Sequence, residues 1–325
     1  MGVLYVTGKN SGVGKTTICS ALINIAKSND FKNVSFLKPI AGDASQDSLI
    51  ISKLCEVPEQ GKPTKSISQA IKIIKKADSE NDLVVVEAFS DLSLDDHKDI
   101  VSSVDAKVIV VADFLNRRTK SIIEFAHGFG DYLAGVVVNN LTLYGTTKFE
   151  EVWSDACKKS EINLLGTIPE NRTLLSLTVN EIAEILGAEF YSGQEYGDTL
   201  VENFMVGGFG MDPGQYVFNT RYKKAVIVRG DRPDVQMSAL ETPMSCFIMT
   251  NGIEPIEYVK YESEEEKVPI LIIQENTLDT MNMVDKLTNY AKFNHSEKLD
   301  EAQSLIIENL KVEEIITNFG QLSLM

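Results

Sequence analysis

Short apolar runs alternate with longer amphipathic segments along the first part of the chain. Runs that are apolar throughout and rich in β-branched residues are typical of strands buried on both faces of a parallel sheet. The predicted strands are Val3–Thr7, 34–39, Leu83–Glu87, 107–111, 135–139 and 163–166. The predicted helices are Lys15–Ser28, 47–55, 66–76, Thr119–His127, 147–160 and Val179–Leu186. This alternation predicts an α/β fold with a doubly wound, mainly parallel sheet.

The rhythm pauses at residues 192–198, where glycine, serine and acidic residues cluster. Such a cluster is typical of a connection between domains. Beyond it, predicted strands at Lys224–Arg229, Cys246–Thr250 and 269–274 alternate with helical segments. We therefore predict two domains, residues 1–195 and 196–325, of which the second is a smaller α/β unit.

Charge and composition exclude several classes of function. The chain carries 31 basic and 47 acidic side chains, a formal net charge of -16, which opposes binding to nucleic acid or to an anionic membrane. Four scattered cysteines without a CxxC pair and three scattered histidines indicate neither a disulfide framework nor a zinc site. Neither a signal sequence nor a membrane-spanning run is recognisable, so we expect a cytoplasmic protein.

A glycine-rich loop between the first predicted strand and the first predicted helix has the context of a Walker A motif. Backbone N–H groups of such a loop surround phosphate oxygens, its lysine reaches the β and γ phosphates, and the next hydroxyl binds Mg²⁺. The loop therefore predicts binding of ATP or ADP with Mg²⁺, with Lys15 as the phosphate-binding lysine and Thr16 as a metal ligand. The predicted nucleotide-binding residues, here called the P-loop, are Gly8, Lys9, Asn10, Ser11, Gly12, Val13, Gly14, Lys15, Thr16 and Thr17.

This loop is one residue longer than GxxxxGK[ST], since five residues separate Gly8 from Gly14. In that form, GxxSGVGKTT, it resembles the loop of dethiobiotin synthetases and cobyrinate diamide synthetases. The segments FLKPI, which contains Lys38, and QDSL, which contains Asp47, resemble two further segments of that family. The resemblance implies that Lys38 lies near the phosphates as a catalytic residue together with Lys15. It also implies that Asp47 is a Mg²⁺ ligand. The alternatives are a lysine that ends a strand in water and an aspartate that caps a helix.

Glu87 ends an apolar predicted strand, as the acid of a Walker B strand does, and is the third candidate Mg²⁺ ligand. In the synthetases this glutamate opens an EGAGG-type turn, whereas the sequence here continues AFSDL without any glycine. We therefore expect metal binding to be retained and the substrate pocket of the synthetases to be lost.

Two further residues have alternative interpretations. Asn139 ends another predicted strand, and relatives use such an asparagine to contact the nucleotide base; alternatively, its side chain bonds its own backbone in a turn. Lys9 is comparable with the second lysine of deviant Walker A proteins, which act across a dimer. Its spacing from Lys15 is one residue too long, which favours a solvated lysine.

Nearly the whole chain resembles the N-terminal region of long phosphotransacetylases. The resemblance rests on the segments LLGTIPE and TVNEIAE, and on GDRPDVQ, ALET and TNG of a DRTGG domain. In those enzymes a catalytic acyltransferase domain follows, whereas this sequence ends at Met325. The resemblance therefore implies a regulatory region or a free-standing homologue, with an acyltransferase as a candidate partner, and not acetyl transfer itself. It also implies a homodimer.

The turn RGDRPD joins a predicted strand to a predicted helix and forms a second candidate site. Its members are Arg229, Asp231, Arg232 and Asp234. Guanidinium groups beside a helix N-terminus can bind an anionic effector. The alternative is a tight turn locked by Arg–Asp pairs.

These observations leave three hypotheses for function. The first is a nucleotide-dependent regulator or sensor that responds to a small-molecule effector. The second is an ATP-dependent ligase in which Lys15 and Lys38 stabilise phosphoryl transfer to an acceptor. The third is a scaffold with vestigial ATP binding that serves assembly alone. Whether the chain is an enzyme is left open by the sequence.

Overall fold

The computed structural model describes residues 2–29, 31–40, 45–58, 62–115, 118–208 and 214–317, without the side chains of residues 45–47 and 150. The chain divides into two compact units, Met1–Glu170 together with Phe293–Met325, and Asn171–Lys292. This division differs from the predicted domains 1–195 and 196–325. Residues 171–195 belong to the second unit, and the C-terminal segment returns to the first.

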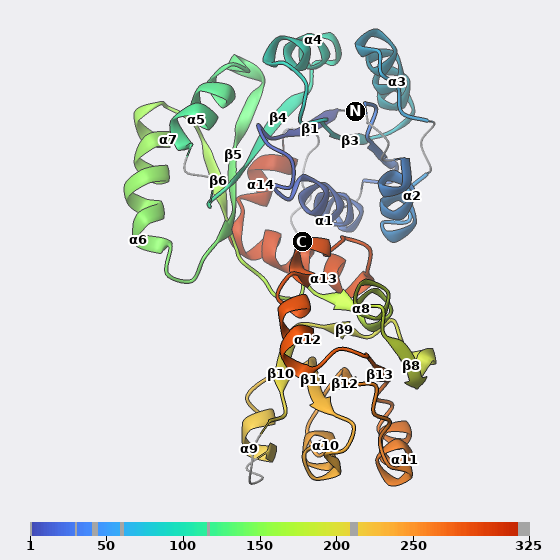
Figure 1. The fold of residues 1–325 in the computed structure, drawn as a ribbon. Helices are drawn as coiled ribbons and strands as arrows, with labels where there is room; N and C mark the ends of the chain where they lie inside the picture. Colours follow the sequence, from blue (N-terminus) through green and yellow to red (C-terminus); the bar gives the residue numbers. More distant parts are fainter. Residues whose placement is uncertain are drawn as a thin grey trace. The chain divides into compact units, whose positions relative to one another are not determined.

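The first unit is built on a parallel sheet with the strand order β2-β3-β1-β4-β5-β6 (Figure 1). The central strand β1 pairs with β3 on one side and with β4 on the other. Every residue of β1 and β3 is buried, which explains why both are apolar along most of their length. The strands are β1 Val3–Thr7, β2 Val34–Leu37, β3 Leu83–Glu87, β4 Lys107–Asp113, β5 Leu133–Leu141 and β6 Leu164–Pro169. The predicted doubly wound fold is confirmed.

Helices cover both faces of this sheet. The connections from β3 to β4, β5 and β6 cross the sheet in the same direction, opposite to the connection from β1 to β2 that contains α1. Because such crossovers are right-handed, their helices lie on the face of the sheet opposite α1. The helices of the first unit are α1 Lys15–Ser28, α2 Ser45–Leu54, α3 Ile67–Glu80, α4 Leu94–Val104, α5 Thr119–His127, α6 Thr146–Phe149, α7 Asp155–Lys159, α13 Ser296–Asn309 and α14 Val312–Ile316, with short helical turns at Gly130–Tyr132 and Glu150–Ser154.

The C-terminal segment completes the first unit. Because the crossovers after β3 leave the α1 side of β4 to β6 uncovered, another element must shield those strands from water. Helix α13 packs against α1 and β6, and the Lys311 N–H donates to the Leu165 carbonyl at 2.9 Å. A Cβ on Gly166 would lie 2.2 Å from the Asn309 carbonyl oxygen, so this close approach requires glycine. Long-range packing therefore assigns residues after 292 to the first unit.

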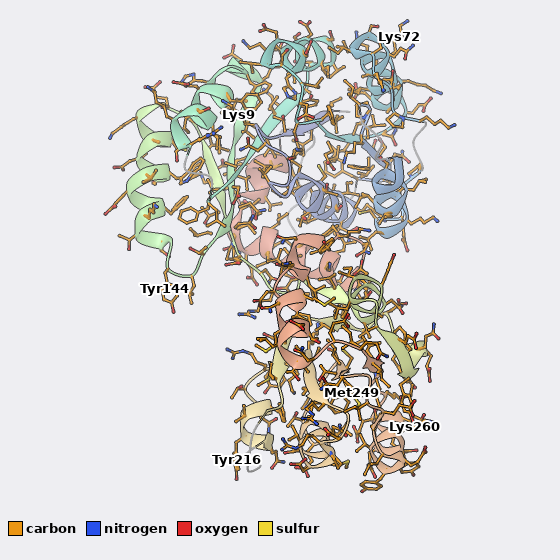
Figure 2. All side chains as sticks on the ribbon, viewed as in Figure 1. Lys9, Lys72, Tyr144, Tyr216, Met249 and Lys260 are labelled. Carbon is orange, nitrogen blue, oxygen red and sulfur yellow. The ribbon has the colours of Figure 1, made fainter. Side chains whose placement is uncertain are left out.

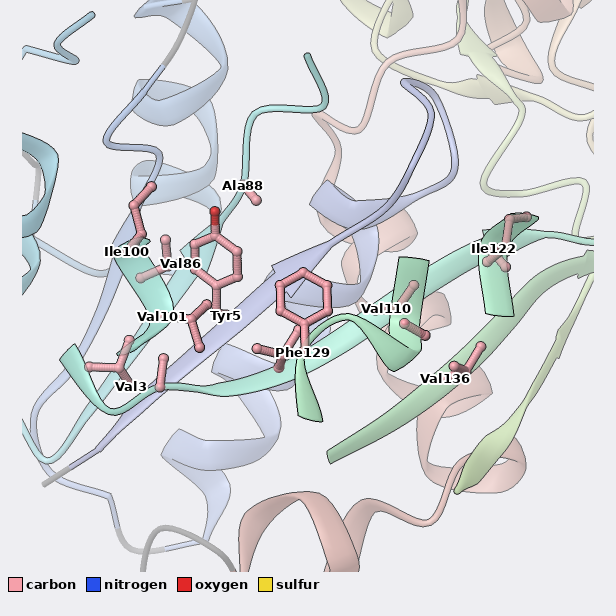
Figure 3. Packing of buried hydrophobic residues seen from close by; sticks show 14 of the residues in the cluster. Val3, Tyr5, Val86, Ala88, Ile100, Val101, Val110, Ile122, Phe129 and Val136 are labelled. Atoms are coloured by element: carbon pink, nitrogen blue, oxygen red, sulfur yellow. The ribbon is translucent and has the colours of Figure 1, made fainter. Parts of the chain in front are cut away.

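A buried histidine joins the central strand to α4. The Tyr5 hydroxyl lies 2.8 Å from His97 Nδ1, and the imidazole packs edge-on against Phe125 and Phe129. Figure 3 shows Tyr5 and Phe129 in this core. His97 is 1% exposed, and burial lowers its pKa to about 4. The folded protein therefore holds this ring neutral, with Nδ1 free to accept from Tyr5 when the proton is on Nε2.

This histidine predicts an acid-dependent loss of stability. Because the folded-state pKa lies below the unfolded value of about 6.5, the unfolded chain binds the proton first as the pH falls. The contribution of His97 is fully present above pH 6.5 and is lost toward pH 4. We expect the free energy of unfolding to fall by about 2 kcal/mol between pH 7 and pH 5 from this group. Urea unfolding at both pH values measures it.

The matched variant is His97→Asn, whose amide oxygen can still accept from the Tyr5 hydroxyl but does not titrate. This variant is expected to be less stable at pH 7, because it leaves a small cavity. Its loss of stability between pH 7 and pH 5 should be smaller than that of the wild type by about 2 kcal/mol. Equal losses in the two proteins would exclude His97 as the source.

The second unit contains a five-stranded sheet with the order β10-β11-β12-β13-β8, in which β8 alone among these strands is antiparallel to its neighbour. Separate apolar clusters fill its two faces. The strands are β7 Leu177–Thr178, β8 Glu189–Ser192, β9 Leu200–Val201, β10 Asn203–Val206, β11 Lys224–Arg229, β12 Cys246–Thr250 and β13 Ile270–Ile272. The helices are α8 Val179–Leu186, α9 Gly214–Phe218, α10 Pro233–Leu240, α11 Glu257–Glu265 and α12 Thr277–Val284, with 3-10 turns at Gln194–Tyr196 and Leu287–Tyr290. The predicted second, smaller α/β domain is confirmed.

Candidate functional site

The P-loop lies at the carboxyl end of β1, where the strand order reverses direction. Ligands of open α/β sheets bind at such a switch point. Gly14 has a φ of 90° and immediately precedes α1, whose first residue is Lys15. A Cβ on Gly8 would lie 2.7 Å from the Val111 carbonyl oxygen of β4, so the loop passes close to the neighbouring strand. The strand, loop and helix thus have the arrangement that the motif predicts.

The Lys15 side chain is held inside the loop rather than in solvent. Lys15 is 7% exposed, and its ammonium donates to the Ser90 hydroxyl. Burial lowers the pKa of Lys15, an effect that the nearby Glu87 carboxylate opposes. Ser90 in turn donates to the Asn10 carbonyl of the P-loop at 3.3 Å. Ser90 is not among the site residues predicted from the sequence, although a hydroxyl just beyond the strand that ends at Glu87 was an available signal.

Glu87 and Lys38 form a buried ion pair beside Lys15. Lys38 Nζ lies 3.0 Å from Glu87 Oε1, and the side chains are 12% and 4% exposed. The register of β2 on β3 pairs Leu37 with Val86, so the residues that follow these two meet at the end of the sheet. The structure therefore brings together three residues that the sequence analysis selected separately. Two ammonium groups and one carboxylate give this cluster a net positive charge.

Two buried oxygens at this end of the sheet have no hydrogen-bond partner among the described residues. They are Glu87 Oε2 and Thr7 Oγ1, on adjacent strands. A buried carboxylate oxygen without a partner is costly, and a hydrated Mg²⁺ is a ligand that would satisfy it. Thr16, half-buried in the first turn of α1, carries the second candidate oxygen. The oxygens of Glu87 and Thr16 are of the type that Mg²⁺ prefers, and a Mg²⁺ site at these residues stays a prediction. The side chain of Asp47, in the first turn of α2, lies outside the described residues.

Asn139 supports the P-loop directly. Its amide donates to the Val13 carbonyl at 3.0 Å, and a Cβ on Gly14 would lie 2.2 Å from the same amide nitrogen. This contact differs from a side chain bonded to its own backbone, the alternative considered above. Contact with a nucleotide base stays a prediction.

Lys9 of the P-loop contacts α5. Its ammonium donates to the hydroxyl of Ser121 on α5 and lies 3.4 Å from the Ser121 carbonyl oxygen. In Figure 2, Lys9 lies beside α5. Lys9 is exposed, as its spacing predicts. Its ammonium is nevertheless held by the contact with α5.

The second candidate site consists of two local ion pairs. Arg229 Nη2 lies 2.5 Å from Asp231 Oδ2, and Arg232 Nη2 lies 2.7 Å from Asp234 Oδ2. The hydrogen bond from Arg232 lowers the pKa of Asp234. A Cβ on Gly230 would lie 1.9 Å from a backbone oxygen across the turn, which fixes glycine there. The arrangement matches the alternative of a locked turn, and an anion site here stays a prediction.

Comparison with known families agrees with this geometry. A family model described as an AAA domain matches residues 3–177, and a DRTGG domain model matches residues 181–287. The first match covers more than half of the chain, so the chain belongs to this family, a dethiobiotin synthetase-like P-loop domain that is here combined with a DRTGG domain. The predicted resemblance is confirmed.

Two curated relatives match nearly the whole chain and are phosphate acetyltransferases. The phosphate acetyltransferase of Nitratidesulfovibrio vulgaris is 24% identical over 96% of this chain and 51% of its own length. That of Pseudomonas putida is 21% identical over 95% of this chain and 51% of its own length. The MinC:MinD cell division protein complex of Aquifex aeolicus is similar in structure, at 16% identity over 54% of this chain and 84% of that chain, with a TM-score of 0.41. The chain thus spans about half the length of the curated relatives it matches.

Among the helices that the structure describes, none combines the length and the apolar character that crossing a bilayer requires.

Proposed function

We propose that the first unit binds Mg²⁺ with ATP or ADP at the P-loop, and that the chain is a nucleotide-dependent regulator or sensor. The observation that carries this proposal is the buried Lys15 ammonium at the start of α1, beside the Lys38–Glu87 pair. Positive charge, loop backbone and helix N-terminus converge there on a position suited to a polyphosphate. The roles of the loop residues are those that the motif predicts, with Thr16 and Glu87 toward the metal.

The regulated partner that we propose is a phosphate acetyltransferase domain in the cytoplasm. The support is that this chain aligns with about half of the length of each phosphate acetyltransferase reported above. In this proposal the DRTGG unit transmits the nucleotide state. A nucleotide can shift the equilibrium between two conformations of the chain only as far as its affinities for those conformations differ.

The second candidate function is an ATP-dependent ligase. It is favoured by the position of Lys38 beside Lys15, because two lysines can stabilise the charge that develops while the γ-phosphoryl group is transferred. The acceptor would be a carboxylate, which would become an acyl phosphate as ATP becomes ADP. The loss of the glycines after Glu87 weighs against a synthetase-type acceptor pocket.

Phosphate release from Mg·ATP distinguishes the two functions. The regulator is expected to bind ATP and to release phosphate slowly, at a rate that small carboxylates and amines leave unchanged. A rate that rises saturably with one acceptor would establish the ligase instead. Phosphate release by the Lys15→Ala variant provides the background, since that variant lacks the proposed phosphate-binding lysine.

A further inference from the structure

A cavity of about 390 Å³ opens beside the P-loop, between the segment after β3 and α5. We propose that this cavity, the α5 pocket, binds a small zwitterion with an aliphatic body, in the class of the aliphatic α-amino acids. The proposal names the effector of the proposed regulator and rests on that function only for the coupling to nucleotide. Its volume lies within the range of small-molecule sites.

The wall of the pocket combines an apolar surface with polar groups. Leu92, Leu94 and Phe125 form an apolar surface. Lys9 and Ser121 supply a cation and a hydroxyl. Such a combination of an apolar wall with a few polar groups is typical of a ligand site that fixes one orientation.

A carboxylate fits the Lys9 side of the pocket. The Lys9 ammonium is held against α5 by the Ser121 hydroxyl and carbonyl, and no carboxylate among the described residues forms an ion pair with it. An ordered ammonium without an acidic partner is suited to a charge-assisted hydrogen bond with a carboxylate.

Glu124 makes the pocket selective for a ligand that carries an amine beside its carboxylate. It lines the cavity one turn beyond Ser121 on α5. Its described ionic contact is with Lys120 at 4.0 Å, and the two side chains are 67% and 92% exposed. Because exposed pairs of this kind are weak, Glu124 remains available to an ammonium group. A simple anion would be repelled by this carboxylate, whereas the zwitterionic head of an α-amino acid offers a carboxylate to Lys9 and an ammonium group to Glu124.

Ser90 couples the pocket to the nucleotide site, since it lines the cavity and accepts from Lys15. When Lys15 turns to a phosphate, the Ser90 hydroxyl is released toward the pocket. Mg·ATP should therefore raise the affinity for the zwitterion, and by reciprocity the zwitterion should raise the affinity for Mg·ATP by the same factor.

Calorimetric titration with three probes of similar shape tests the proposal: leucine, 4-methylpentanoate, which lacks the amine, and isoamylamine, which lacks the carboxylate. Leucine is expected to bind at least about tenfold more tightly than either analogue, because each analogue leaves one charged side chain unpaired. Each titration is made with and without Mg·ATP on the full chain.

Glu124→Gln is the diagnostic variant, since Glu124 is exposed and its replacement should not disturb folding. In this variant the affinities for leucine and 4-methylpentanoate should become similar, while Mg·ATP binding in the absence of leucine is unchanged. Glu80→Gln, at the exposed end of α3, is the matched control and should retain the wild-type preference.

The outcomes separate this proposal from the proposed function. If Mg·ATP binds but leucine does not, with or without nucleotide, the α5 pocket is not such a site although the nucleotide function stands. If leucine binds and Mg·ATP does not, the pocket stands and the nucleotide function fails. Unchanged leucine affinity in Glu124→Gln would place the leucine elsewhere, and dimerisation altered by this variant without any leucine binding would assign the pocket to a second copy of the chain.

Discussion

Replacing Lys38 with methionine should destabilise the first unit by about 4 kcal/mol, because it leaves the Glu87 carboxylate buried without its cation. Glu87 is 4% exposed as a side chain and has one oxygen without a hydrogen-bond partner among the described residues. Removal of one member of a buried pair costs far more than the pair contributes, since the remaining charge cannot be solvated. Urea unfolding of the variant at pH 7 measures the loss.

The control is the same substitution in an exposed pair. Lys120 lies 4.0 Å from Glu124, and these side chains are 92% and 67% exposed. Lys120→Met is expected to change the free energy of unfolding by less than about 0.5 kcal/mol. The double variant Lys38→Met/Glu87→Gln should recover a large part of the loss, because both charges are then absent. Equal effects of Lys38→Met and Lys120→Met would show that the buried pair is not formed.

Gly14→Ala is expected to destabilise the protein by about 3 kcal/mol and to weaken Mg·ATP binding. The new Cβ would require a φ of 90° and would lie 2.2 Å from the Asn139 amide nitrogen, which itself donates to the Val13 carbonyl. Left-handed strain adds about 1 kcal/mol, and displacement of Asn139 adds a steric cost of about 2 kcal/mol. Unfolding by urea in the absence of nucleotide reports both contributions.

Gly12→Ala separates the two contributions. Gly12 also has a positive φ, of 71°, but a Cβ there meets nothing within 4 Å. Its cost should be the backbone strain of about 1 kcal/mol. In a Gly14→Ala background, Asn139→Ala should be less destabilising than in the wild type, because the clash is already relieved by the truncation. Identical losses for Gly12→Ala and Gly14→Ala would contradict the contact with Asn139.

Local signals predicted the centre of the site well. Strand β1, the P-loop and α1 follow one another directly, so an apolar run, a glycine pattern and an amphipathic helix were sufficient to place Lys15. Lys38 was selected because FLKPI resembles a segment of the synthetases, and Glu87 because it ends an apolar strand. Their pairing depends on the register between β2 and β3, which the sequence of either strand alone does not determine.

The elements that sequence reasoning missed depend on long-range packing or carry many charges. Helix α4 has acidic residues in its first turn and few apolar ones, although the capping box between Ser93 and Asp96 was a readable start signal. Helix α13 also carries many charged residues, and it packs against β6, which is distant from it in the sequence. The compact units differ from the predicted domains because long-range contacts, which composition does not reveal, place the last helices in the first unit.

Titration of Mg·ATP into the wild type and into Lys15→Ala by isothermal calorimetry tests the central claim most directly. Lys72→Ala, which removes an exposed lysine on α3, is the control for charge alone. We predict saturable binding that Lys72→Ala retains and that Lys15→Ala weakens by at least about 100-fold, the value of a strong charge-assisted contact. Absence of binding to the wild type, or equal affinity in Lys15→Ala, would contradict a nucleotide site at this P-loop.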